Sequence, residues 1–76
     1  MKRFKVGKAY EWYQAEYGHI TVLKRTPKCI VATNGGSTWR MIVRTDVDGN
    51  EYVIDTSVPK KWRDAFTCNA KWEMAI

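Results

Sequence analysis

The sequence contains few of the residues from which catalytic centres and metal sites are built. It has one histidine, His19, and two cysteines, Cys29 and Cys68. A catalytic Cys–His pair needs a thiol beside the imidazole and a third group that orients it, and no pattern in the chain indicates one. A zinc site needs closely spaced ligands such as Cys-x-x-Cys, which are also missing. We therefore expect neither enzyme activity nor a metal ion or other cofactor.

Long apolar runs are missing too. No run approaches the ~18 residues that cross a bilayer as a helix, and the basic start Met1–Lys8 lacks the apolar stretch that follows in a signal peptide. We therefore expect a cytoplasmic protein that does not contact membranes. In a reducing cytoplasm Cys29 and Cys68 are most simply free and buried, with a disulfide between them as the alternative.

Linkers, internal repeats and low-complexity runs are absent from the sequence, so we expect residues 1–76 to form a single domain. A chain this short must use its apolar side chains efficiently. Four Trp, four Tyr and two Phe each supply a large area to bury. This composition suits the core of a small barrel or sandwich.

The clearest element in the sequence is a β-hairpin. Its first arm, Thr38–Thr45, alternates apolar and polar side chains, with Arg40 and Arg44 on the polar face. Gly49 supplies the positive φ that a tight turn needs, and the return arm Glu51–Asp55 is rich in β-formers. The acidic turn is no calcium loop, because its glycine comes too early and strands rather than helices flank it.

Shorter strands are expected before the hairpin: Arg3–Val6, Lys8–Trp12, His19–Thr26 and Lys28–Thr33. Residues 8–17 also fit helical spacing, but their many aromatic side chains favour a strand through about Trp12 and then a loop. In the strand that ends before Pro27, Ile20 and Val22 share one face while Leu23 and Arg25 share the other. Short turns join these strands, which predicts an antiparallel meander.

The pattern changes after the hairpin. Thr56 and Ser57 can cap a helix and Pro59 is acceptable in its first turn, which predicts a helix over Val58–Phe66. For Thr67–Glu73 two readings stay open, a return to an extended strand and a continuation of the helix.

Several short motifs follow one another along most of the chain: Phe4–Tyr10, Val22–Lys28, Trp39–Ile42, Asp48–Tyr52 and the late Ala70. In this order they resemble small proteins of unassigned function from bacteriophages and integrative elements of gut Firmicutes. The resemblance implies a mainly β fold, a small antiparallel SH3-like barrel or strongly bent sheet of about five to six strands, with one short C-terminal helix. It also implies a bacterial cytoplasm, and it carries no catalytic residues. The basic segment Lys60–Arg63 is longer than the corresponding short helix.

Basic residues carry the functional content of the sequence. The net charge of +5 favours a polyanion or an acidic protein surface as the partner. If the strand that carries Arg25 lies beside the hairpin, then Arg25, Arg40 and Arg44 form a stripe along one sheet face. The complete set of candidate nucleic-acid-binding residues is Lys24, Arg25, Lys28, Arg40, Arg44, Lys60, Lys61, Trp62 and Arg63.

Each candidate also has a structural reading. Trp62 can act as a stacking platform for a base, or it can belong to the core as its helical spacing indicates. Arg40 and Arg44 can contact phosphates, or they can pair with carboxylates on neighbouring strands such as Glu51, Asp55 and Glu11.

Two functions follow from these readings. The first is a nucleic-acid-binding module, in which a basic groove tracks the phosphates and an aromatic side chain stacks on a base. The alternative is a protein-interaction module, an inhibitor or adaptor that docks on an acidic or strand-edge surface of a host or phage protein.

Overall fold

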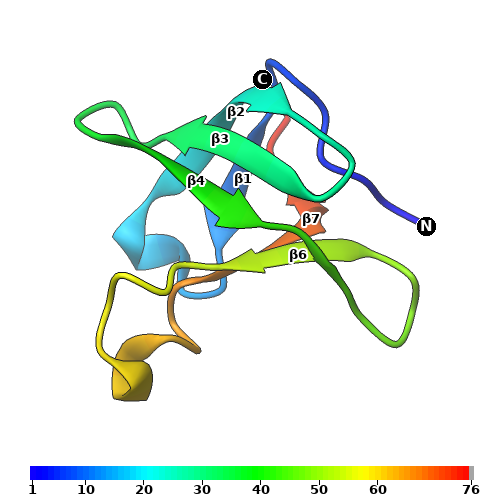
Figure 1. Cartoon of the computed structure of the whole chain (residues 1–76). Coiled ribbons are helices and arrows are strands. Elements are labelled where there is room, and N and C mark those ends of the chain that lie inside the picture. The colour runs from blue at the N-terminus through cyan, green and yellow to red at the C-terminus, as the bar shows by residue number, and fades with distance from the viewer. Residues whose placement is uncertain (76) are drawn as a thin grey trace.

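The computed structural model describes residues 1–75, in which seven strands form one antiparallel sheet. The strands are β1 (Ala9–Trp12), β2 (His19–Arg25), β3 (Cys29–Thr33), β4 (Thr38–Ile42), β5 (Arg44–Thr45), β6 (Glu51–Ile54) and β7 (Thr67–Glu73). Their order is β4-β3-β2-β1-β7-β6-β5, and the sheet curls until it is a nearly closed barrel (Figure 1). The predicted antiparallel, mainly β barrel class is confirmed, but the expected number of strands was too low.

Two single turns of 3₁₀-helix, η1 (Ala15–Tyr17) and η2 (Lys60–Trp62), complete the secondary structure. Within residues 1–75, no helix has both the length and the apolar character needed to cross a membrane.

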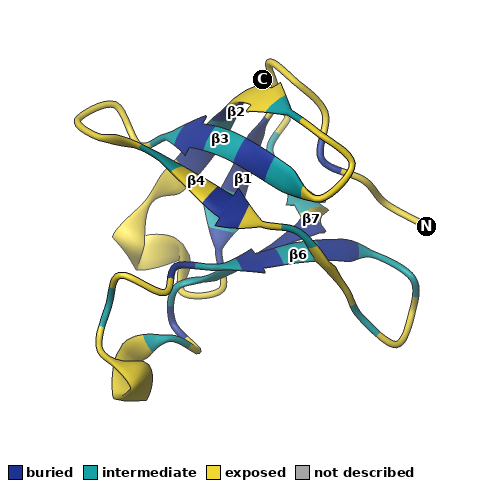
Figure 2. Ribbon diagram, viewed as in Figure 1, coloured by how far each residue is buried: buried dark blue, intermediate teal, exposed yellow. Residues whose placement is uncertain are grey.

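The core consists of side chains that alternate inward along the strands. In β2, Ile20 and Val22 point inward and are fully buried, while Thr21 between them is half-buried. Buried residues lie in most of the strands (Figure 2), and their side chains form one core cluster. They are Phe4, Tyr10, Trp12, Ile20, Val22, Ile30, Ala32, Met41, Val53, Cys68 and Ala70. The aromatic members give this short chain a core of sufficient volume, as its composition predicts.

The first arm of the predicted hairpin is divided between two strands. β4 pairs with β3 along its whole length, and the N–H of Val43 still donates to Lys28 O at 2.8 Å. Only β5 continues into the hairpin, where Arg44 is opposite Tyr52 and Thr45 is opposite Glu51. The split produces the additional strand. It also leaves β4 and β6 as neighbours without a hydrogen-bonded ladder in the described chain, and we call this boundary the seam.

The predicted first strand, Arg3–Val6, is wrong. The segment does not join the sheet, although Phe4 is buried in the core with 1% of its surface exposed. The N–H of Phe4 donates to a side chain, Glu51 Oε1, at 2.8 Å, and Lys2 O accepts from the N–H of Glu51 at 2.9 Å. The Glu51 carboxylate therefore accepts a backbone hydrogen bond that a neighbouring strand would accept if this segment were a strand.

The predicted helix Val58–Phe66 is also wrong, because only the turn η2 forms there. The N–H groups of Trp62, Ala65 and Phe66 donate to carbonyls three residues earlier, which is the 3₁₀ pattern and not the α pattern. Segments this short gain few helical hydrogen bonds, and β7 begins at Thr67. Of the two readings for the last segment, the strand is confirmed, with Cys68 and Ala70 buried.

Candidate nucleic-acid interface

Arg25 does not lie on the outer face where the strand alternation placed it. Between β2 and β3 the register shifts by one residue, because Val22 is opposite Ala32 whereas Lys24 is opposite Val31. The extra residue, Leu23, forms a bulge, and a one-residue shift exchanges the two faces of a strand. Arg25 is consequently opposite the buried Ile30 and points inward.

Arg25 is bound inside the protein. Its Nη1 donates to Glu51 Oε1 at 2.8 Å and its Nη2 to Glu51 Oε2 at 3.1 Å, and Nη1 also donates to Phe4 O at 2.8 Å. This two-armed hydrogen bond lowers the pKa of Glu51 below its ordinary value and raises the pKa of Arg25. The predicted phosphate contact of Arg25 is therefore a structural ion pair.

The bulge brings Lys24 to the outside in place of Arg25. Lys24, Val31 and Arg40 lie in one row across β2, β3 and β4. The row borders a hollow of about 250 Å³ lined by Lys24, Arg25, Thr26, Cys29, Val31 and Arg40. Two exposed cations thus flank a floor that contains Cys29 and Val31.

A second hollow lies at the seam. It measures about 220 Å³ and is lined by Arg40, Met41, Ile42, Arg44, Ile54 and Thr56. Arg40 therefore belongs to both hollows and connects them. We call the three exposed cations along these hollows, Lys24, Arg40 and Arg44, the basic track.

The alternative pairings of the hairpin arginines are not formed. Among residues 1–75, neither Arg40 nor Arg44 takes part in an ion pair or a side-chain hydrogen bond. Glu51 is bound by Arg25, and Asp55 Oδ1 accepts from the N–H of Ser57 at 2.9 Å. Both guanidinium groups of the basic track are therefore available to an external anion.

The other predicted residues lie in two further places. Lys28 is exposed in the turn that leads into β3. Trp62 is 48% exposed, so it acts as a surface side chain rather than as the core residue that its spacing also allowed. The ammonium group of Lys61 is 5.8 Å from the centre of the Trp62 ring, and Lys60 beside it is exposed.

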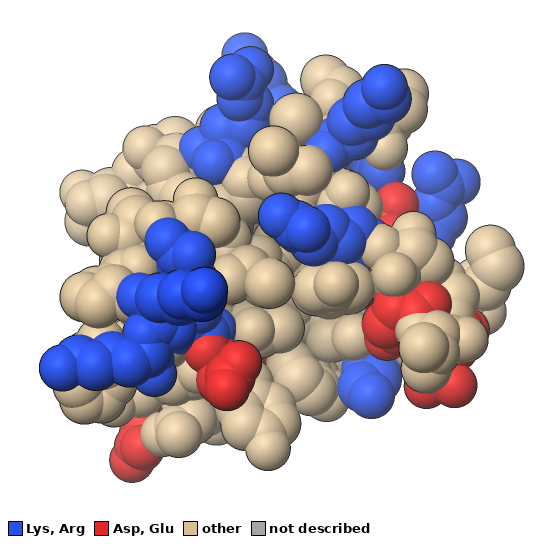
Figure 3. Space-filling view, turned by 60° about the horizontal axis from the view of Figure 1, so that its bottom comes forward, with Lys and Arg blue, Asp and Glu red and all other residues tan. Residues whose placement is uncertain are grey.

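Arg63 is the second predicted contact that the fold uses internally. Its Nε donates to Val58 O at 3.3 Å and its Nη2 to Thr56 O at 3.1 Å. Thr56 also lines the seam hollow. The hydrogen bonds of Arg63 therefore link the basic turn η2 to a residue that borders the basic track. Figure 3 shows lysine and arginine side chains in separate groups over this side of the molecule, with fewer carboxylates among them.

The cysteines and the histidine add no charged group to the basic track. Both cysteines are free, so the disulfide alternative is wrong. Burial raises the pKa of the Cys68 thiol to about 12, which removes it as a nucleophile. His19 is exposed opposite Glu11 in the β1–β2 pair. Among the described residues no group of three or more His, Cys, Asp and Glu side chains could hold a metal ion.

The apolar floors of the two hollows were not predicted. Val31 and Ile42 alternate with core residues in β3 and β4, and in the sequence this alternation indicates strands without indicating a hollow. Ile54 and Thr56 reach the seam through tertiary packing that no local pattern indicates. In comparisons with known proteins, no family model, curated protein or solved structure matches this chain, so its resemblance to phage and integrative-element proteins remains a prediction.

Proposed function

We propose that the protein is a non-enzymatic binding module of a bacterial mobile element, which acts in the cytoplasm and binds single-stranded nucleic acid along the basic track. One observation carries this proposal. Arg40 lies between two hollows with partly apolar floors, has an exposed cation on either side, and forms no pair with a carboxylate in the described chain.

The spacing of the cations supports contact with successive phosphates. Lys24 and Arg40 are on strands separated by β3, which places their backbones roughly 10 Å apart. Arg40 and Arg44 are four residues apart along the chain, a separation of roughly 13 Å at most. A flexible single strand can follow such a row and place unstacked bases in the hollows, whereas the bases of a duplex stay stacked and cannot enter them.

The turn η2 extends this surface with a stacking group. Trp62 is 48% exposed with Lys61 against its ring, and stacking on an exposed aromatic side chain tolerates any base. The protein is therefore expected to bind with little sequence preference and with a strong dependence on salt.

The test is a fluorescence-anisotropy titration of labelled single-stranded and duplex oligonucleotides at several salt concentrations. We expect tighter binding of the single strand, and each of R40A and R44A should lower the slope of log K against log salt by about 0.7. K8A removes an exposed lysine outside the track and serves as the matched control. A flat titration at low salt, or equal losses in K8A and R40A, would refute nucleic-acid binding by this surface.

A protein-interaction module is the second candidate, and the seam favours it. The alternation of the β3–β4 ladder directs the backbone N–H and C=O of Arg40 away from β3, toward the seam, where β6 does not pair with them. Trp39 Nε1 is buried without an acceptor among the described residues, beside a hollow of about 300 Å³ that Trp39 and Asp55 line. An extended acidic segment of a partner could pair with this edge and with Arg40. Protection of the Arg40 amide from hydrogen exchange on binding would separate strand pairing from nucleic-acid binding.

A further inference from the structure

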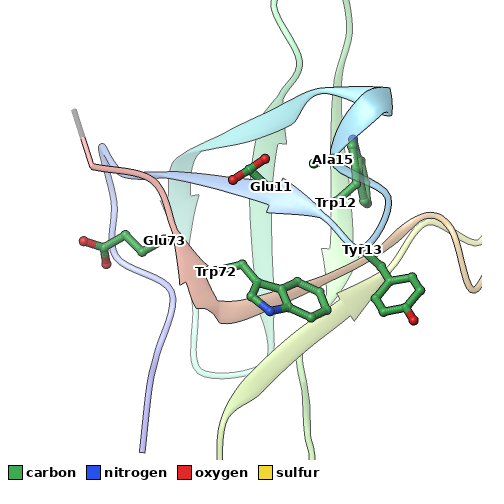
Figure 4. Close-up of a pocket in the computed structure, with 6 residues that line it drawn as sticks. All are labelled: Glu11, Trp12, Tyr13, Ala15, Trp72 and Glu73. Atoms are coloured by element: carbon green, nitrogen blue, oxygen red, sulfur yellow. The ribbon is translucent and has the colours of Figure 1, made fainter.

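A further hollow lies on a different part of the barrel and has a different chemistry. It measures about 230 Å³ and is lined by Glu11, Trp12, Tyr13, Ala15, Trp72 and Glu73 (Figure 4). It shares no residue with the two hollows of the basic track. Its charged side chains are both carboxylates, on a protein whose net charge is +5.

An irregular strand pairing creates this hollow. Tyr10 is opposite Glu73 and Trp12 is opposite Cys68, so that β7 advances five residues while β1 advances two. The additional residues bend β7 outward and bring Trp72 beside Tyr13. The backbone of Tyr13 is also fixed to β7, because its N–H donates to Thr67 O at 2.7 Å. Both aromatic side chains are thus positioned by the sheet.

The rings of Tyr13 and Trp72 are tilted relative to each other. Their centres are 5.8 Å apart and their planes are inclined by 44°, and Tyr13 is 63% exposed. In Figure 4 they lie side by side on one side of β1, whereas Trp12 points to the other side. Aromatic faces that remain open to solvent in this way attract cations through their negative π surface.

Trp72 already has a cation against its ring. The ammonium group of Lys71, an exposed side chain of the same strand, is 5.5 Å from the ring centre. This distance lies within the range of an attractive cation–π contact. The environment of Trp72 therefore accepts positive charge.

Glu11 is the carboxylate that remains available to a ligand. Glu73 is within 4.0 Å of Lys5 Nζ and accepts from the hydroxyl of Tyr10 at 3.5 Å, and in Figure 4 it points away from both rings. The side chain of Glu11 forms no ion pair or hydrogen bond within residues 1–75. Glu11 and the two tilted rings thus line the same small hollow.

We propose that this hollow binds the guanidinium group of an arginine that a partner protein displays on its surface. A guanidinium group is planar, so it can stack on Trp72 and at the same time donate two hydrogen bonds to Glu11. An ammonium group is more strongly hydrated and lacks the planar fork of donors, so it makes the combined contact less well. The carboxylates of this hollow disfavour phosphate, and the hollow shares no residue with the basic track, so both surfaces can be occupied at the same time.

The test uses three short peptides, acetyl-Gly-Xaa-Gly-amide with arginine, lysine or citrulline in the centre, titrated into the ¹⁵N-labelled protein. Citrulline keeps the shape of arginine but has no charge. We expect saturable shifts of the Trp72 indole and the Glu11 and Tyr13 amides with arginine, and binding about tenfold weaker with citrulline. Lysine should bind more weakly than arginine. Equal binding of arginine and citrulline, or no saturable shift at these groups, would overturn the proposal.

Matched variants locate the site. E11Q and Y13A should each weaken arginine binding about fivefold. E16Q and Y17A change the same residue types outside the hollow and should leave it unchanged. If E16Q weakens binding as much as E11Q, the effect is general electrostatic attraction and the assignment is wrong. Thermal unfolding of each variant shows that it is folded, so a loss of binding is not a loss of structure.

Discussion

The guanidinium group of Arg25 donates hydrogen bonds to both carboxylate oxygens of Glu51, at 2.8 and 3.1 Å. The same carboxylate accepts a hydrogen bond from the backbone N–H of Phe4. The side chains of Arg25 and Glu51 are only 19% and 10% exposed. This one contact joins β2, β6 and the N-terminal segment. It also withdraws from the surface an arginine that the strand pattern assigned to ligand binding.

Breaking this pair should destabilise the protein strongly. E51Q leaves Arg25 without a counter-charge in a largely buried place, which costs about 3 kcal/mol. Urea unfolding at neutral pH measures the loss. R40A, which removes an exposed arginine, should change the free energy of unfolding by less than about 0.5 kcal/mol. Equal stability of the two variants would show that the Arg25–Glu51 pair is not an important part of the fold.

Stability should fall in acid for the same reason. The pKa of Glu51 is lowered in the folded protein from its ordinary value of 4.5, mainly by hydrogen bonding to Arg25. Between the folded and unfolded pKa values the unfolded chain binds more protons, so stability rises with pH. The contribution is complete above pH 4.5 and is lost as the pH falls through the folded pKa. Urea unfolding between about pH 6 and pH 3 should show this decline, and it should be smaller in E51Q.

The bulge at Leu23 predicts which single residue of β2 can be deleted without preventing folding. Deletion of Leu23 makes the β2–β3 register regular and keeps Lys24 opposite Val31, with Arg25 still pointing inward. We therefore expect this variant to fold, with a melting temperature close to that of the parent. Deletion of Thr21, from the evenly paired part of the same strand, moves core residues to the outside and should prevent folding. The folding of both variants is measured by circular dichroism, and similar behaviour of the two would contradict the bulge.

Trp62 should matter for binding and little for stability. It is 48% exposed, so W62A should cost less than about 1 kcal/mol in unfolding free energy. Loss of a stacking platform should weaken single-strand binding by about 1–3 kcal/mol. Quenching of tryptophan fluorescence by the oligonucleotide should decrease in the variant. If W62A is destabilised and its binding is unchanged, Trp62 is a core residue and not a stacking platform.

The two cysteines should differ in reactivity. Cys29 is half-buried on the outer face, whereas Cys68 is fully buried with its pKa raised to about 12. Because the thiolate is the reactive form, a thiol reagent at neutral pH should label Cys29 alone in the folded protein and both residues in urea. Mass spectrometry of the labelled peptides distinguishes these outcomes. Rapid labelling of Cys68 under native conditions would show that the core opens readily.

The sequence predicts those parts of this fold that depend on local patterns. The alternation in Cys29–Thr33 and Thr38–Ile42 and the glycine of the Asp46–Asn50 turn lead correctly to antiparallel strands and their inward faces. The helix over Val58–Phe66 failed because helical spacing of apolar residues does not reveal whether a segment has enough length to form α-helical hydrogen bonds.

The candidate site could be predicted only in part. Arg40 and Arg44 lie on the outer face as their alternation indicates. Arg25 does not, because a bulge is a property of two strands and the sequence of one strand does not encode it. The hollow of Tyr13 and Trp72 brings together residues from β7 and the end of β1, and only the irregular pairing of these strands makes them neighbours.

The attachment of Phe4 has a consequence for how this chain reaches its final shape. The segment around Phe4 is synthesised before its hydrogen-bond partner Glu51, which lies 47 residues later in the chain. A contact between such distant residues carries a large cost in chain entropy and forms late in folding. Docking of the Phe4 segment therefore requires the β5–β6 turn to be present. We expect Phe4 to dock late in refolding, together with the β1–β7 pairing, in which Trp12 and Cys68 lie still further apart in the chain, and a slow refolding phase should report on both.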